Sequence, residues 1–139
     1  MKYLNLYRIS SYLLLFFCAT HTIGGMLSNK SRGAEADAVL SSMKSVQFAV
    51  QGASCTYYGF YFGFGIMVSI FLLFSAILAW YLGGLDAKSK AALSPVTWAF
   101  FASHAATAFL SWAYFFIAPG VTATLIAVLL GLACVKKSW

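Results

Sequence analysis

Charged side chains are scarce in this chain, where they make up 9% of 139 residues, against about 25% in an average soluble domain. Acidic residues are the rarest, with three Asp and Glu against nine Lys and Arg. A water-soluble fold of this size would have to expose a largely apolar surface. The composition therefore excludes a soluble enzyme, a nucleic-acid-binding module and a disordered tail. The hydrophobic residues, at 62%, instead indicate an integral membrane protein.

Other absences exclude particular chemistries. The three cysteines, Cys18, Cys55 and Cys134, are widely spaced and form no C-x-x-C pair, so neither a disulfide framework nor a thiol-redox motif is indicated. No Asp or Glu lies within a predicted span, which argues against a carboxylate proton relay and weakens any comparison with four-helix sterol isomerases. The sequence also has no H-E-x-x-H motif and no phosphate-binding glycine loop.

The gaps between charged residues predict the number of membrane spans, because ionisable side chains are costly in hydrocarbon and a span needs about 20 apolar residues. Gly83-Gly84 is expected to end the second span, and Pro119-Gly120 to separate the third from the fourth. The sequence thus predicts a single all-α domain over residues 1–139. Its fold class is a four-helix transmembrane bundle, up-down-up-down, with spans near residues 5–27, 57–82, 95–118 and 121–136.

Basic residues predict the orientation of this bundle, because they favour the cytoplasmic side of a membrane. With four spans, six basic residues fall on the side of the termini and three on the other side, where Glu35 and Asp37 also lie. Both termini are therefore expected in the cytoplasm. The first group is Lys2, Arg8, Lys88, Lys90, Lys136 and Lys137, and the second is Lys30, Arg32 and Lys44.

The long connection between the first two spans has a helical pattern over residues 34–51. Its apolar side chains recur at three- and four-residue intervals, and Gly52 suits the end of a helix. A short amphipathic helix in this first, outer loop is expected to lie in the membrane interface or to cap the bundle. The recurring residues are Val39, Leu40, Met43, Val46 and Val50.

Two histidines lie where hydrocarbon should have excluded them, His21 in the first predicted span and His104 in the third. Both are expected about 20 Å above the inner surface, at 1.5 Å of rise per residue. The first and third helices of such a bundle are diagonal partners, so both rings could face a shared centre. One interpretation is a neutral ring that hydrogen-bonds a neighbouring helix. The other is a functional site, which intramembrane ionisable groups usually mark.

Polar and aromatic side chains also gather near the outer mouth of the predicted bundle, where Ser111 and Trp112 of the third span could join them. Aromatic walls with a few polar groups are typical of a small-molecule site, although an interfacial aromatic belt has the same composition. We therefore expect an outward-facing pocket that binds a membrane lipid or a small hydrophobic ligand, with no resident metal or cofactor. The predicted ligand-binding residues are His21, Thr22, Gln47, Gln51, Tyr57, Tyr58, Tyr61 and His104.

Four alternatives stay open from the sequence. The first is a membrane-embedded enzyme that uses His21 as acid–base, and the second is a b-type haem held between His21 and His104. The third is a soft metal bound by these two histidines and Cys18. The fourth is an assembly partner or homo-oligomer, because the G-x-x-x-G at Gly59 and Gly63 allows helices to approach closely, within the chain or between copies.

One set of motifs resembles an uncharacterised family of small bacterial four-helix integral membrane proteins. The resemblance covers the first two predicted spans and the loop between them. It implies a multi-pass protein of the bacterial plasma membrane, adds weight to His21 and the Tyr-rich start of the second span, and transfers no catalytic residue. The motifs are His21-Thr22 with Gly24, Met43-Lys44, Gly52 and the run from Thr56 to Gly65.

Overall fold

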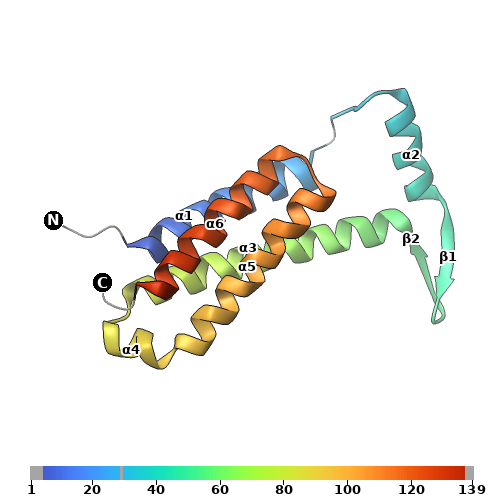
Figure 1. The fold of residues 1–139 in the computed structure, drawn as a ribbon. Helices are drawn as coiled ribbons and strands as arrows, with labels where there is room; N and C mark the ends of the chain where they lie inside the picture. The colour runs from blue at the N-terminus through green and yellow to red at the C-terminus, as the bar shows by residue number, and fades with distance from the viewer. Residues whose placement is uncertain (1–4, 29, 137–139) are drawn as a thin grey trace. The chain divides into compact units, whose positions relative to one another are not determined.

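The computed structural model describes residues 5–28 and 30–136, and it divides into two compact units. Unit 1 is Met1–Phe17 with Leu72–Trp139, and unit 2 is Cys18–Phe71. Two helices, α1 (Leu6–Ala19) and α3 (Tyr57–Gly84), contribute residues to both units (Figure 1). The chain is mostly helical, as the sequence predicts.

Unit 1 contains three further helices, α4 (Ala87–Ala92), α5 (Ser94–Tyr114) and α6 (Ile117–Val135). Asp86 caps α4, because its carboxylate accepts a hydrogen bond from the backbone N–H of Ser89 at 2.7 Å. The helices α5 and α6 form a hairpin and lie side by side (Figure 1).

The break between α5 and α6 falls earlier than predicted. Only Phe115 and Phe116 connect the two helices, and α6 begins at Ile117, so the expected boundary at Pro119-Gly120 is wrong. Proline is tolerated in the first turn of a helix, where its missing N–H would have no intrahelical acceptor. Pro119 therefore lies inside α6 instead of ending a helix.

The interior of unit 1 is unusually polar for so apolar a chain. Ser10, Ser11, Ser75 and Thr97 are buried, and the Ser11 hydroxyl donates to the carbonyl of Ala76 at 2.8 Å. Large apolar side chains instead cover the outside of α1, α3, α5 and α6. This distribution is expected where lipid replaces water as the solvent and interhelical hydrogen bonds hold the helices together.

Glycines on α6 let aromatic rings of α5 lie directly on its backbone. A Cβ added at Gly120 would come within 2.8 Å of the Trp112 ring, and one added at Gly131 within 2.9 Å of the Phe101 ring. The Trp112 Nε1–H also donates to Thr124 Oγ1 at 2.9 Å. Small residues thus provide the close approach in unit 1, as in many membrane bundles.

Unit 2 contains a π-helix, η1 (Thr20–Met26), that continues α1, and a separate helix, α2 (Ala34–Ser45). Gly33 precedes α2 with φ 103°, a conformation that favours glycine. Glu35 and Asp37 lie in the first turn of α2 and Lys44 in the last, where each charge suits the helix dipole.

A β-hairpin follows α2 in place of its predicted last turns (Figure 1). Strands β1 (Gln47–Val50) and β2 (Ala53–Thr56) pair antiparallel, so the helix expected over 34–51 ends at Ser45 and the fold is not purely α-helical. Gln51 and Gly52 have φ of 49° and 84°, the positive pair that a tight type I′ hairpin turn requires. Gly52 therefore turns a hairpin instead of ending a helix.

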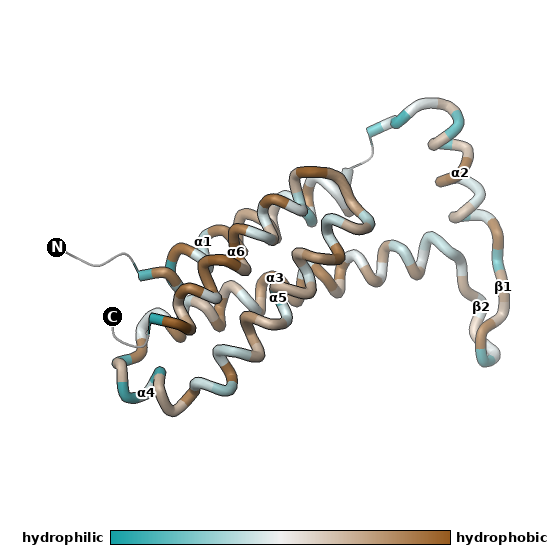
Figure 2. The backbone as a smooth tube through the Cα atoms, viewed as in Figure 1, coloured by the Kyte–Doolittle hydropathy of each residue, from teal (hydrophilic) through white to brown (hydrophobic). Residues whose placement is uncertain are grey.

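Three helical segments of the described chain are long and apolar enough to cross a membrane: Leu6–Met26, Tyr57–Gly84 and Ile117–Val135. The first two agree with the predicted spans near 5–27 and 57–82. Figure 2 shows how the candidate spans differ from the short helices: α6 is hydrophobic along most of its length, whereas α2 and α4 carry hydrophilic residues. The chain is therefore a membrane protein by the length and composition of these helices.

Candidate ligand-binding site

The π-helix η1 determines how His21 is held. Its wide turns close with i→i−5 hydrogen bonds, as in the bond from the Leu27 N–H to the Thr22 carbonyl at 2.9 Å. The His21 Nε2–H donates to the carbonyl of Gly65 on α3 at 3.0 Å. Met26, five residues after His21, packs its thioether on Gly65, where an added Cβ would collide with the Met26 sulfur. The π-helical spacing thus brings two side chains to one glycine.

A small polar network surrounds this contact. The Thr22 hydroxyl lies 2.7 Å from the Cys18 carbonyl and 2.8 Å from Ser69 Oγ, and the Cys18 thiol donates to the Ser69 carbonyl at 3.4 Å. Such bonds satisfy polar groups inside an apolar layer. His21 Nδ1 faces Gly25, lying 4.0 Å from where a Cβ of that residue would be, and it has no hydrogen-bond partner among the described residues.

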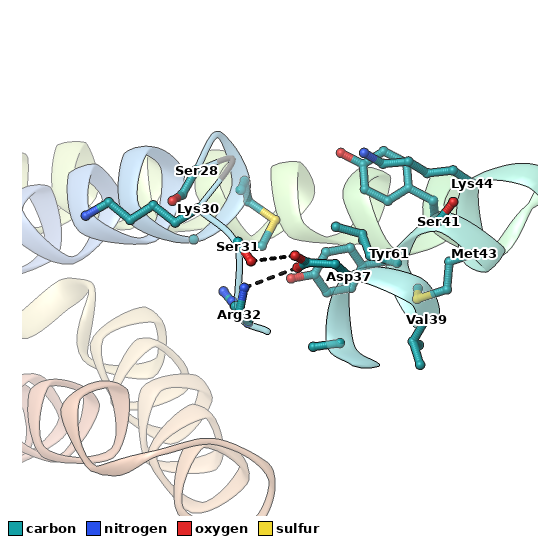
Figure 3. A pocket seen from close by; sticks show the side chains of 15 residues that line it. Ser28, Lys30, Ser31, Arg32, Asp37, Val39, Ser41, Met43, Lys44 and Tyr61 are labelled. Carbon is teal, nitrogen blue, oxygen red and sulfur yellow. Dashed lines mark hydrogen bonds between the residues drawn. The ribbon is translucent and has the colours of Figure 1, made fainter. Parts of the chain in front are cut away.

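A cavity of about 660 Å³ lies elsewhere in unit 2, between the end of η1, the loop that follows it, α2 and the start of α3 (Figure 3). We call it the α2 cavity. Its volume is within the range of small-molecule sites. The lining residues are Gly25, Met26, Ser28, Lys30, Ser31, Arg32, Ala36, Asp37, Val39, Leu40, Ser41, Met43, Lys44, Tyr58 and Tyr61.

Hydrogen bonds to Asp37 shape the loop at one end of the α2 cavity. Its carboxylate accepts from the Ser31 hydroxyl and from the backbone N–H of Arg32 at 3.1 Å (Figure 3). The Ser31 hydrogen bond, followed by the Arg32 N–H, lowers the pKa of Asp37 below its usual value, because both bonds favour the ionised carboxylate. The loop before α2 is therefore tied to the first turn of that helix.

The opposite end of the α2 cavity is aromatic and apolar. The Lys44 ammonium lies 4.7 Å from the centroid of the Tyr58 ring, a cation–π distance. The Tyr58 ring also stacks on Phe62 at 5.9 Å between centroids. Val39 and Met43 of α2 lie toward this end, and Leu40 also belongs to the lining (Figure 3). The cavity thus offers cationic groups together with an apolar wall.

The sequence-predicted residues of unit 2 do not all meet in this cavity. Tyr58 and Tyr61 line it, whereas His21 and Thr22 belong to the network at Gly65 and Ser69. The remaining three, Gln47, Gln51 and Tyr57, lie on the hairpin or next to it and are exposed. Gln47 accepts from the Ser54 hydroxyl across the strands, and the Tyr57 ring packs on Phe48 at 4.6 Å between centroids.

The other predicted residues belong to unit 1 and have local contacts there. His104 is 2% exposed, its Nδ1–H donates to the Phe100 carbonyl at 3.0 Å, and its ring meets the Phe100 ring edge-on. Ser111 is buried, and Trp112 bonds Thr124 as described above. Among the described residues, no three His, Cys, Asp or Glu side chains gather closely enough to hold a metal ion.

Sequence reasoning missed the basic residues of the α2 cavity. The sequence predicts Lys30, Arg32 and Lys44 as loop charges that orient the membrane helices, with Lys44 also part of the Met43-Lys44 motif, and it does not place them among the ligand-binding residues. One available signal was their position on the loop with fewer basic residues, where the usual charge bias does not require them. Comparison of the chain with protein-family models, curated proteins and solved structures finds no match.

Proposed function

We propose that the chain is a four-span membrane protein that binds a lipid-like or small hydrophobic ligand in the α2 cavity. The observation that carries this proposal is the cavity itself, which lies beside the ends of two candidate spans, at η1 in Leu6–Met26 and at the start of α3. A ligand with an apolar chain can reach such a place from the membrane without crossing water.

The fourth span in this proposal is α5. Its 21 residues would match a bilayer core of about 30 Å at 1.5 Å per residue. Three of its polar residues, Thr97, His104 and Ser111, are buried, so they lower its mean hydropathy without being exposed to lipid. Because two residues connect α5 to α6 and the helices pack along each other, a membrane-spanning α6 would carry α5 with it.

Four spans would return the chain to the side on which it began. The basic residues then support cytoplasmic termini and an outer position for the loop that carries α2, in a bacterial plasma membrane as the resemblance implies. With Cys18, Cys55 and Cys134 replaced by serine, a cysteine placed at Ala38 of α2 should react with a membrane-impermeant maleimide in whole cells. A cysteine placed at Lys136 in the same background should react only after lysis. The reverse pattern would contradict this orientation.

The test of ligand binding is to fill the cavity. Ala36 lines the cavity and Ala38 does not, although both are exposed on α2 two residues apart. With the protein in nanodiscs that contain a diazirine-bearing phosphatidylcholine, Ala36→Trp should reduce crosslinking to residues 36–43 by more than half, and Ala38→Trp should leave it unchanged. Equal crosslinking in all three proteins would contradict the proposal.

A membrane-embedded enzyme is the second candidate, because His21 keeps Nδ1 without a described partner while Gly65 orients the ring. A ring held in this way could accept a proton at Nδ1. Lipid extracts of membranes that contain the wild-type protein or His21→Gln should then differ in at least one species. Identical extracts, with both proteins present at equal levels, would remove this candidate.

A further inference from the structure

The charges of the α2 cavity are unbalanced. Three basic side chains line it, Lys30, Arg32 and Lys44, together with one acidic side chain, Asp37. The other acidic residue of α2, Glu35, does not belong to the lining. The lining therefore carries a net charge of +2 when all four groups are ionised, from three positive charges and one negative.

Asp37 does not neutralise these cations directly. Its two oxygens accept from the Ser31 hydroxyl and the Arg32 backbone N–H, so the loop itself occupies the carboxylate. Within the described residues, none of the three basic side chains forms an ion pair. Lys44 instead lies over the Tyr58 ring. Cations that line a concave surface without counter-charges attract anions.

The basic side chains and the apolar side chains occupy different parts of the cavity. Figure 3 shows Lys30 and Arg32 on the loop at one end and Lys44 at the other, with Val39 and Met43 on the α2 side. The Met26 thioether lies in the same lining. An anionic group at the loop end would therefore leave apolar side chains available for an attached hydrocarbon chain.

From this arrangement we infer that the ligand of the α2 cavity is an amphiphile with a net anionic, phosphate-ester headgroup, which Lys30 and Arg32 bind while α2 contacts its hydrocarbon. The inference rests on the proposed function and specifies its ligand. Arginine and lysine are the usual partners of phosphate oxygens in proteins. It also explains why basic residues occur on a loop that the proposed orientation places outside, against the usual charge bias.

The experiment compares two photoreactive lipids with the same diazirine-bearing chains, phosphatidylglycerol and phosphatidylcholine. Each is added at the same mole fraction to phosphatidylcholine nanodiscs that hold the full chain, and crosslinks are mapped by mass spectrometry. Residues 36–43 should crosslink to phosphatidylglycerol on the order of tenfold more than to phosphatidylcholine, since basic residues near a membrane surface favour the binding of anionic lipids.

Two double variants separate the cavity from general surface charge. Lys30→Gln with Arg32→Gln should reduce phosphatidylglycerol crosslinking to the phosphatidylcholine level, while phosphatidylcholine crosslinking stays unchanged and reports an intact cavity. Lys88→Gln with Lys90→Gln removes the same charge from α4 and should leave the preference as in the wild type. An equal loss of preference in both double variants would overturn the inference.

The remaining outcomes are also decisive. Equal crosslinking by both lipids at residues 36–43 would overturn the headgroup inference and leave the proposed function standing. Absence of crosslinks there with either lipid would instead contradict the proposed function. Soluble glycerol 3-phosphate should not compete at millimolar concentration, and if it abolishes the crosslinks, a free phosphate ester is the ligand and the amphiphile is wrong.

Discussion

The two units of this protein place their polar residues in opposite ways. Unit 1 buries Ser10, Ser11, Ser75 and Thr97 and exposes large apolar side chains. Unit 2 exposes most of its polar side chains, and several of them line the α2 cavity. In unit 1, glycines of α6 let aromatic rings of α5 lie on its backbone. In unit 2, hydrogen bonds to Asp37, Gly65 and Ser69 accompany the close contact of Met26 with Gly65.

Because of this difference, we expect substitutions in the two units to affect different properties of the protein. Packing in unit 1 depends on close contact between backbones and rings, so its stability should be sensitive to added volume. The α2 cavity leaves space by comparison, and substitutions there should alter binding more than stability. The following predictions test this division, beginning with the largest expected effect.

Added volume should destabilise unit 1 strongly. Gly120→Leu places a side chain where the Trp112 ring already lies 2.8 Å from the position of a Cβ. We expect a loss of about 3 kcal/mol or more, because overpacking forces side chains and backbone to shift. The measurement is thermal unfolding in detergent micelles, followed by circular dichroism.

Gly63→Leu is the matched control in unit 2, because an added Cβ at Gly63 meets no atom within 4 Å. Its melting temperature should stay within experimental error of the wild type. Within unit 2, Gly63 therefore has no close packing contact among the described residues, and a contact between copies stays a prediction for the G-x-x-x-G. Equal losses in the two variants would contradict the contrast between the units.

Removing the imidazole of His21 should lower the stability of the protein moderately. His21→Leu eliminates the hydrogen bond from Nε2 to the Gly65 carbonyl, although Ser69 still donates to that carbonyl at 3.3 Å. We expect a loss of about 1 kcal/mol, as for other single hydrogen bonds. His21→Gln keeps a donor and should recover part of it. A much larger loss in both variants would indicate that the ring mainly fills space.

The hairpin of unit 2 should gain stability from a glycine. Gln51 has φ 49°, a conformation that costs residues with a Cβ about 1 kcal/mol. Gln51→Gly should therefore slow hydrogen exchange of the amides in β1 and β2, and Gly52→Val should accelerate it. Unchanged exchange in both variants would show that the turn does not limit the opening of this hairpin.

Acid should loosen the start of α2. Hydrogen bonds from Ser31 and Arg32 lower the pKa of Asp37 in the folded protein, so their stabilisation is complete above the ordinary carboxyl pKa. It is lost as the pH falls through the lowered pKa. The protection of the amides of residues 31–37 against hydrogen exchange, relative to the intrinsic rate at each pH, should decrease below about pH 4. Asp37→Asn should remove this dependence, whereas Asp86→Asn, which alters the cap of α4, should not.

Much of the fold could be predicted because hydrocarbon penalises each charge separately. The spans near residues 5–27 and 57–82 follow from the gaps between charged residues, together with the polar residues that precede Tyr57. The end of α2 could not be predicted in this way, because Val46 and Val50 fit both a helical face and a strand. Pairing of β1 with β2 decided between them, with help from the turn at Gln51 and Gly52.

The candidate site could be predicted less well. Tyr58 and Tyr61 were identified by their place at the start of a span, and both line the α2 cavity. Lys30 and Arg32 were not, because a charge on a loop looks the same whether it faces water or a cavity. The π-helical spacing that brings His21 and Met26 to Gly65 was also missed, since a period of 3.6 residues was assumed.

The sequence by itself determined that this protein belongs in a membrane and where its apolar helices approximately lie. The reason is that the free energy of transfer into hydrocarbon is, to a first approximation, a sum over individual residues. Only the tertiary structure decided which side chains share a cavity, which strands pair and which glycine each ring meets. Those outcomes depend on contacts between different segments of the chain, and the residue pattern within one segment does not encode them.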